Sequence, residues 1–218
     1  MILQPLILCL LLLSSGTPVW HARRAPAHHL PYIKLVFSYH PQVDSIPSDT
    51  IFYSLARPLK WEDFQGRPSA NGPSAAVTYS SFAYEGSSRA IKDTLQINLD
   101  MQVFFIKSAS WVRADARTAY GLAHEQLHFD ITRLVVERFK QRLKQTALNR
   151  DDYDSVIQYQ YLEAFREMNR LQYAFDRETR HGLDPAAQLR WRDKINVGMK
   201  NNGVLPEELG YEFDYLHQ

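Results

Sequence analysis

The chain has 218 residues, of which 45% are hydrophobic and 12% aromatic, and its formal net charge is +1. These values predict a globular protein, and the near balance of charge excludes a basic surface for nucleic acid or for an anionic membrane. The single cysteine, Cys9, lies close to the N terminus. A metal site elsewhere in the chain must therefore use histidine and carboxylate ligands.

The first part of the chain is typical of an exported protein. An apolar run from Ile2 to Leu13 is followed by small residues, which predicts a signal peptide over residues 1–22 and a secreted or periplasmic location. The alternative is a buried or disordered apolar terminus. The run is too short to span a bilayer, so we expect no stable membrane insertion. Residues 23–31 read as a linker, and residues 32–218 as a single domain.

Residues 32–106 are predicted to form a mostly antiparallel sheet. Strands are expected at Tyr32–Phe37, Ala75–Tyr84 and Thr94–Phe105. In the third of these, apolar residues alternate with polar ones, as in a strand with one buried face. This strand either aligns an extended peptide substrate by edge pairing or lies in the interior of the sheet.

From residue 110 onward the apolar residues follow the period of a helix. Helices are expected from about Asp115 to Lys144, from about Tyr153 to Thr179 and around Ala186 to Val197. A sheet part at about 32–106 followed by a helical part at about 110–218 is an α+β arrangement. The inner face of the second helix is predicted to carry Leu162, Phe165, Met168, Leu171, Gln172 and Phe175.

The first predicted helix contains the pattern H-E-x-x-H, formed by His124, Glu125 and His128. Residues four apart lie about 40° apart around a helix, so both imidazoles point the same way and can bind one metal ion. Glu125 lies on the same side, where its carboxylate can act as a general base toward water activated by Zn²⁺. The pattern therefore predicts a catalytic zinc site.

A catalytic zinc ion usually takes a third protein ligand. Our first choice is His181, at the predicted end of the second helix, and the alternatives are Asp176 and Glu178. Asp176 could instead be a hydrogen-bond acceptor that orients a liganding imidazole. Asp130 is excluded because it lies about 200° around the helix from His128. A hydrogen bond that ties the helix to neighbouring structure is its expected role.

Four segments resemble a known family. They are RPLKWEDFQG at 57–66, SWV at 110–112, LAHEQLHFDI at 122–131 and FDRETRHG at 175–182, and together they are similar to the DUF922 group of predicted secreted bacterial zinc-dependent proteases, over roughly 51–197. The resemblance implies a zincin-like fold with His124 and His128 as ligands and Glu125 as base. For the third ligand the resemblance leaves Asp176, Thr179 and His181 as candidates. Phe175 stands where the family commonly has tyrosine.

These features together predict a secreted zinc metallopeptidase that acts on a peptide or protein. Zinc held by His124, His128 and His181 would activate water, and Glu125 would accept its proton and return it to the leaving amine. Two alternatives remain. One is a zinc hydrolase of another amide, for example in the cell wall. The other is a non-catalytic, zinc-stabilised binding module of the envelope.

Overall fold

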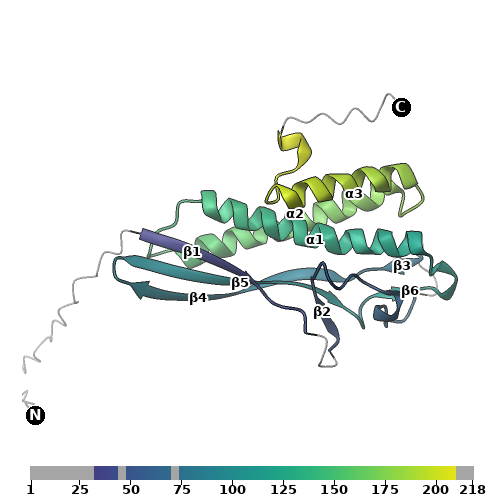
Figure 1. Ribbon diagram of the computed structural model, residues 1–218, viewed down its shortest axis with the longest axis horizontal. Helices are drawn as coiled ribbons and strands as arrows, with labels where there is room; N and C mark the ends of the chain where they lie inside the picture. Colours follow the sequence, from purple (N-terminus) through teal and green to yellow (C-terminus); the bar gives the residue numbers. More distant parts are fainter. Residues whose placement is uncertain (1–31, 44–47, 70–73, 210–218) are drawn as a thin grey trace, which may run out of the picture.

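A computed structural model describes residues 32–43, 48–69 and 74–209. The predicted signal peptide and linker lie outside these residues. Within them, the chain is an α+β fold whose N-terminal half contains the strands and whose C-terminal half contains three long helices, as predicted (Figure 1). None of the described helices combines the length and the apolar character that crossing a bilayer requires.

Strand β5 (Thr94–Ile106) is the centre of the main sheet. Strand β4 (Ser80–Ile91) pairs with it in antiparallel register along almost its whole length. On the other edge, β1 (Tyr32–Tyr39) runs parallel to the first part of β5, and β2 (Thr50–Phe52) runs antiparallel to the last part. Because both edges of β5 are paired, it cannot align a substrate by edge pairing. The interior-strand alternative is correct.

The predicted alternation along β5 is confirmed. Its buried side chains all lie on the face that the helices cover: Leu95, Ile97, Leu99, Met101, Val103 and Phe105. The burial of each such side chain stabilises the fold by roughly 1.5–3 kcal/mol. This face forms the main core together with buried aromatic residues of the neighbouring elements, among them Phe82 on β4 and Phe139 on the first helix, whose ring centroids are 6.5 Å apart.

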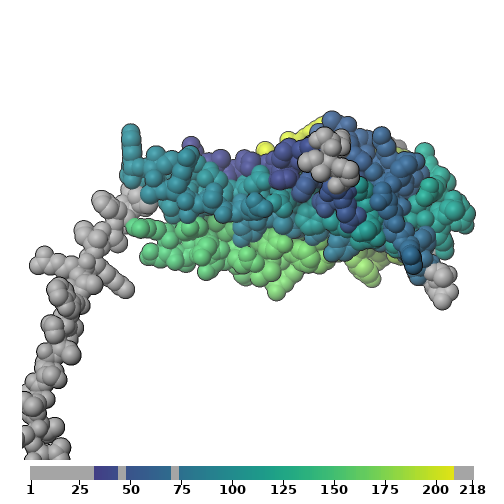
Figure 2. Space-filling model, turned by 90° about the horizontal axis from the view of Figure 1, so that it is seen from below, coloured from purple at the N-terminus to yellow at the C-terminus, as the bar shows by residue number. Residues whose placement is uncertain are grey.

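Three helices complete the fold. Helix α1 (Ala119–Gln145) lies along the sheet, α2 (Tyr153–Thr179) runs beside it, and α3 (Pro185–Lys200) packs on the side of α1 away from the sheet (Figure 1). In the view from below, α2 in green extends along the strands, which are coloured purple to teal (Figure 2). The predicted bounds of α2 are correct to the residue, while α1 begins later than predicted, after a 3-10 turn, η2 (Ala114–Ala116).

The buried stripe of α2 differs from the predicted one. Its buried residues are Ile157, Ala164, Met168, Phe175 and Thr179. Leu162 is 45% exposed, so its assignment to the inner face is wrong. Phe165 is 37% exposed but lies at the edge of that face, because its ring centroid is 6.4 Å from that of the buried Phe82. The small side chain of Ala164 is fully buried instead, in the main core that α2 shares with α1 and the sheet.

Smaller elements surround the first turns of α1. Strands β3 (Ala76–Val77) and β6 (Trp111–Val112) form a two-stranded antiparallel sheet, and the 3-10 turn η1 (Trp61–Asp63) lies nearby. A last 3-10 turn, η3 (Pro206–Leu209), follows α3. The indole Nε1 of Trp61 donates a hydrogen bond to the carbonyl oxygen of Thr118, 3.1 Å away. These contacts bring β3, η1 and the start of α1 around one end of the helix pair, where the H-E-x-x-H residues lie.

Candidate metal centre

The start of α1 fixes the position of the H-E-x-x-H residues. Thr118 is the N-cap, and its hydroxyl oxygen accepts a hydrogen bond from the Gly121 amide at 2.9 Å. Such a cap satisfies one of the amides that a helix leaves free at its N terminus. A side chain at Gly121 would contact Trp61, because a Cβ atom there would lie 3.5 Å from the indole. His124 and Glu125, one turn later, are both buried.

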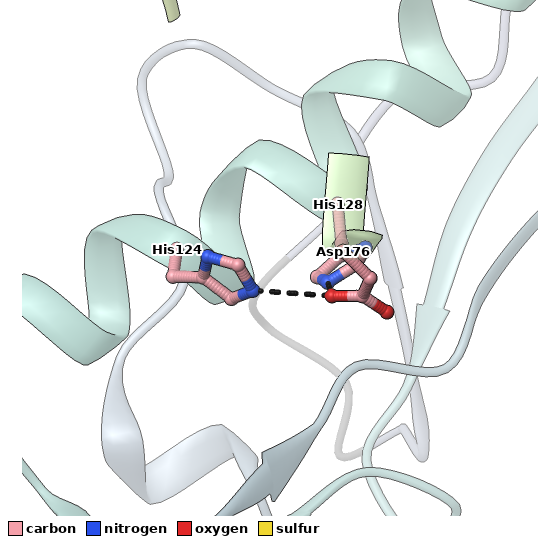
Figure 3. Close-up of side chains that lie close together, drawn as sticks. All are labelled: His124, His128 and Asp176. Carbon is pink, nitrogen blue, oxygen red and sulfur yellow. Dashed lines mark hydrogen bonds and ion pairs between the residues drawn. The ribbon is translucent and has the colours of Figure 1, made fainter. Parts of the chain in front are cut away.

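His124 and His128 converge on Asp176 of α2, as Figure 3 shows. The Nε2 atoms of His124 and His128 lie 3.4 and 3.2 Å from the same carboxylate oxygen, Oδ1 of Asp176. Among the described residues, these three form a group of side chains whose ligand atoms all lie within 4.8 Å of one another. We call them the metal cluster. Both imidazoles are largely shielded from water, with side-chain exposures of 7% and 13%.

A glutamine holds the outer nitrogen of each imidazole. The Nδ1 atom of His128 lies 2.5 Å from Oε1 of Gln172, and the Nδ1 atom of His124 lies 3.1 Å from Oε1 of Gln188. The Gln172 amide group cannot be turned over, because its nitrogen donates to the His128 carbonyl oxygen at 2.8 Å and to Thr132 at 3.1 Å. Its oxygen must therefore face His128, and Nδ1 must carry the proton.

Aromatic packing fixes the planes of the imidazoles. The ring of Phe175 stacks on His124, with centroids 4.5 Å apart and an angle of 23° between the planes, and it meets His128 edge-on at 4.9 Å. Trp191 of α3 in turn contacts Phe175 at 5.5 Å. Phe175 is fully buried. Phe175 thus supports the cluster by packing and offers no hydroxyl.

The cluster has too many hydrogen-bond acceptors. Because Nδ1–H of His128 faces the Gln172 oxygen, a neutral His128 imidazole would turn the lone pair of Nε2 toward the carboxylate of Asp176, which also only accepts. The same holds for His124 in the tautomer that donates from Nδ1 to Gln188. Such an arrangement repels itself unless a cation or additional protons occupy the centre. Two protons would create two imidazolium rings with centroids only 5.0 Å apart. A single divalent cation satisfies all three acceptors.

The pKa shifts of the metal-free cluster agree with this need for positive charge. Burial alone would raise the pKa of Asp176, but hydrogen bonds from His124 and His128 outweigh it and hold the pKa well below its usual value. Burial alone would lower the pKa of His128, but the hydrogen bond to Asp176 and the charge of Glu125 outweigh it and raise the pKa. A metal ion would have to displace that proton.

Glu125 lies beside the metal cluster, and one of its two carboxylate oxygens is held by a hydrogen bond. The hydroxyl of Thr78 donates to Oε2 of Glu125 at 2.7 Å and also approaches the Glu125 carbonyl oxygen at 3.3 Å. In the described part of the chain, Oε1 of Glu125 has no hydrogen-bond partner. The cleft has a volume of about 360 Å³. Its lining includes the metal cluster, Glu125, Trp61, Tyr120, residues 74–78 and residues 181–183.

The other predicted ligands take different positions. His181, our first choice as third ligand, lies at the rim of the cleft with its side chain 73% exposed, and its Nδ1 is 3.6 Å from Oδ1 of Asp176. The side chain that meets both imidazoles is that of the alternative, Asp176. Glu178 accepts a hydrogen bond from the indole nitrogen of Trp191 at 2.8 Å and does not reach the cluster.

Asp130 faces away from the cluster, as predicted. Its Oδ1 accepts hydrogen bonds from the Tyr53 hydroxyl at 3.0 Å and from the Gln126 amide at 2.8 Å. Gln126 in turn accepts from the backbone amide of Leu59 at 2.8 Å. These bonds tie α1 to the segment before η1, which is the connecting role that we expected for Asp130.

The chain reverses sharply where α2 ends. Arg180, His181 and Gly182 all have positive φ angles, of 54°, 55° and 81°. At Gly182 an added Cβ would lie 3.4 Å from the His124 ring, so a small residue allows the turn to approach the imidazole. Helix α3 then begins with Asp184 as N-cap, whose carboxylate accepts from the Ala187 amide at 2.9 Å. This turn brings Gln188 onto His124.

Three supporting residues were not identified from the sequence as partners of the site. Gln172 could have been found, because it precedes Asp176 by four residues and so lies on the same face of α2. Thr78 and Gln188 come from separate elements, and no spacing in the sequence connects them to H-E-x-x-H.

Comparisons with known proteins identify one family. The family model described as "Bacterial protein of unknown function (DUF922)" matches residues 106–182, which include β6, all of α1 and α2 and the turn after α2. This match supports the resemblance to DUF922 and covers His124, Glu125, His128 and Asp176. No curated protein and no solved structure matches the chain. The family's description assigns no activity, so function has to be argued from the site.

Proposed function

We propose that the protein is a zinc-dependent hydrolase that cleaves peptide bonds, with His124, His128 and Asp176 as metal ligands and Glu125 as general base. The observation that carries this proposal is the cluster of three metal-ligating side chains around one point, to which no Lys or Arg of the described residues is paired. Two imidazoles and one carboxylate are a known ligand set of catalytic zinc, and they leave a position for water or substrate.

Two of the three distances between ligand atoms in the cluster fit zinc. In a tetrahedral site with bonds of about 2.0–2.1 Å, neighbouring ligand atoms lie roughly 3.3–3.4 Å apart. The two distances from Oδ1 of Asp176 to the imidazole nitrogens, 3.2 and 3.4 Å, are close to this value. The oxygens of Gln172 and Gln188 supply the outer hydrogen bonds that liganding histidines usually make. Imidazole and carboxylate ligands, without a thiolate, are compatible with zinc. They also suit other divalent ions, which differ from zinc in their affinity for such a site.

Each side chain has a defined task in this proposal. Zinc, when bound, supplies Lewis acidity that makes water more acidic and polarises a carbonyl group. Glu125 takes a proton from the attacking water at Oε1, the oxygen that Thr78 does not occupy, and then delivers it to the leaving amine. Thr78 keeps the carboxylate facing the cleft. Phe175 shields the imidazoles from water on one side.

The shape of the cleft favours an extended peptide as substrate. Residues 74–78 line it, and they include β3, which among the described strands pairs with β6 alone. The second edge of β3 therefore offers backbone groups to which a substrate strand can add. In this proposal β3, and not β5, provides the edge for a peptide substrate.

The substitution Glu125→Gln tests this mechanism. The variant should retain bound zinc and the wild-type melting temperature but lose hydrolysis by about 10²–10⁴-fold, because glutamine cannot accept the proton. Cleavage of a mixed peptide library, followed by mass spectrometry, provides the measurement without knowledge of the specificity. Glu163→Gln, an exposed change on α2, serves as matched control.

Three outcomes separate the proposed function from its alternatives. Peptide cleavage that persists in Glu125→Gln contradicts the mechanism. No cleavage by zinc-loaded wild-type protein contradicts peptide hydrolysis, and cell-wall amides are then the next substrate to test. Activity on neither substrate indicates a zinc-stabilised binding module.

Export to the periplasm or the medium, which we propose from residues 1–22, is tested by fractionating cells that express the full chain.

A further inference from the structure

A second cavity system lies on the opposite side of α1. One cavity of about 440 Å³ lies between residues 53–58, α1 and the end of α3, and a second of about 600 Å³ lies between α1 and the start of α3. Both are lined by Gln126, Asp130 and Asn196, so the two cavities adjoin at these residues. We call the pair of cavities the α1–α3 groove.

The floor of this groove carries an unbalanced carboxylate. Both hydrogen bonds to Asp130, from Tyr53 and Gln126, go to Oδ1. Within the described residues, no hydrogen bond or ion pair reaches Oδ2. The Gln126 amide cannot turn to help, because its oxygen is used by the Leu59 amide.

The walls of the groove are mainly apolar. Leu127 and Ile195 are buried beside Asp130, while Leu189 and Leu55 are exposed at the two ends, with exposures of 50% and 85%. A mainly apolar cavity with a few polar groups is the usual form of a small-molecule site. Two cations, Arg192 and Lys200, lie at the rim, and Arg192 already contacts Asp193 at 3.0 Å.

We propose that the α1–α3 groove binds an ammonium group attached to an apolar carbon skeleton, as in an apolar amino acid or the N-terminal residue of a peptide. The ammonium ion lies on Oδ2 of Asp130, which no cation of the described residues contacts. The apolar side chain packs on Leu127, Ile195 and Leu189. Lys200 is placed to contact the carboxylate of a free amino acid.

This site is distinct from the metal cleft. Asp130 lies on the side of α1 away from His128, and Tyr120 is the only described residue that lines both the metal cleft and the α1–α3 groove. Binding in the groove therefore requires neither a metal ion nor hydrolysis. A failure of the proposed peptidase activity leaves this proposal standing, and the reverse also holds.

Titration with leucine amide, followed by NMR of the folded protein, tests the proposal. Leucine amide should bind, and N-acetyl-leucine amide, which has the same side chain without the charge, should bind at least about tenfold more weakly. Free leucine separates the two sources of the ligand: tighter binding than leucine amide indicates a free amino acid, and weaker or equal binding indicates a peptide N terminus. No binding of leucine amide at about 10 mM would overturn the proposal.

Three variants locate the bound amine. Asp130→Asn keeps the size of the side chain and should weaken leucine amide binding at least about tenfold. Leu189→Ser changes an exposed wall residue, so it should fold normally and still weaken binding, whereas Leu162→Ser on α2 is the matched control and should not. Asp176→Ala should leave binding unchanged. Loss of binding in Asp176→Ala, or full binding in both Asp130→Asn and Leu189→Ser, assigns the amine elsewhere and contradicts the proposal.

Discussion

Helix α1 carries two groups of charged side chains that differ in their balance of donors and acceptors. Toward its C-terminal half, Glu137 accepts from Tyr39 and Arg133 at 2.6 Å each and from Lys140 at 2.8 Å. We call these four residues the Glu137 network. Every oxygen of its carboxylate has a donor, and the guanidinium of Arg133 also lies 3.5 Å from the centre of the Tyr39 ring.

The metal cluster, near the start of the same helix, has the opposite balance. Its two inner nitrogens and one carboxylate oxygen are all acceptors once the outer nitrogens bind glutamine. A network that supplies its own donors is complete without a ligand and contributes stability. A cluster that lacks a cation needs one from outside. The number of hydrogen-bond donors therefore distinguishes the structural Glu137 network from the candidate binding site. The two groups can be tested separately.

Removing the metal should have the largest effect. Treatment with a strong chelator should destabilise the protein by about 4 kcal/mol if free zinc had been about a thousandfold above Kd, since zinc binds the folded cluster and the unfolded chain only weakly. For a chain of this length the melting temperature should fall by roughly 8–16 °C. Differential scanning calorimetry with and without added zinc measures the shift. Equal melting temperatures would mean that the acceptors do not bind zinc.

Breaking the Glu137 network should come next and should not involve the metal. Glu137→Gln is expected to lower the free energy of unfolding by about 2–4 kcal/mol at pH 7, because two half-buried cations lose their counter-charge. Denaturant unfolding measures it, and zinc affinity should stay within about twofold of the wild type. A large loss of zinc would show that the two groups are not independent.

The pH dependence of this variant has a defined sign. Burial alone would raise the pKa of Glu137, but hydrogen bonds from Lys140 and Tyr39 outweigh it and lower the pKa. A lowered folded-state pKa gives stability that is present above the ordinary value near 4.5 and is lost as the pH falls through the folded-state value. The difference between wild type and Glu137→Gln should therefore shrink on acidification. A difference that grows toward acid pH would refute this assignment.

Removing an outer partner of the cluster should have a smaller effect than removing the metal. Gln172→Leu deletes the acceptor that orients His128, and zinc affinity should fall about 10–100-fold, or roughly 1.4–2.7 kcal/mol. Competition with a chelating dye measures the affinity. Gln158→Leu is the matched control on the same helix, since Gln158 only accepts a bond from the Tyr84 hydroxyl. Equal affinity in both variants would show that Gln172 does not orient a ligand.

The smallest effect is expected at an exposed ion pair. Glu163 and Arg166 are paired on the surface of α2, and the Arg166 side chain is mostly exposed. Glu163→Gln should change stability by less than about 0.5 kcal/mol, because water and salt screen exposed pairs. Thermal unfolding at low and high salt measures this. A loss comparable to that of Glu137→Gln would contradict the distinction between balanced buried networks and surface pairs.

Local patterns in the sequence predicted much of the fold. The alternation in Thr94–Phe105 and the bounds of α2 are decided by neighbours along the chain, so they could be predicted. The parallel pairing of β1 with β5 could not, because it joins segments about sixty residues apart. The exposure of Leu162 was also missed, since α2 buries only a narrow stripe and the width of that stripe depends on how α1 approaches it.

The candidate site was predictable to the extent that it lies on one helix. His124, Glu125 and His128 are set by the helical repeat alone. The choice between Asp176 and His181 depends on how the end of α2 meets α1 and on the three positive φ angles at 180–182, which no spacing reveals. Helical geometry did exclude Asp130, because its direction also follows from the repeat.

The zinc content of three purified proteins tests the account most directly: the wild type, Asp176→Ala and His181→Ala. All three should first be shown to be folded by circular dichroism. We expect about one zinc ion per chain in the wild type and in His181→Ala, and a loss of at least about 100-fold in affinity in Asp176→Ala, because only Asp176 meets both imidazoles. Retained zinc in Asp176→Ala with loss in His181→Ala, or a folded wild-type protein that binds no zinc, would contradict the account.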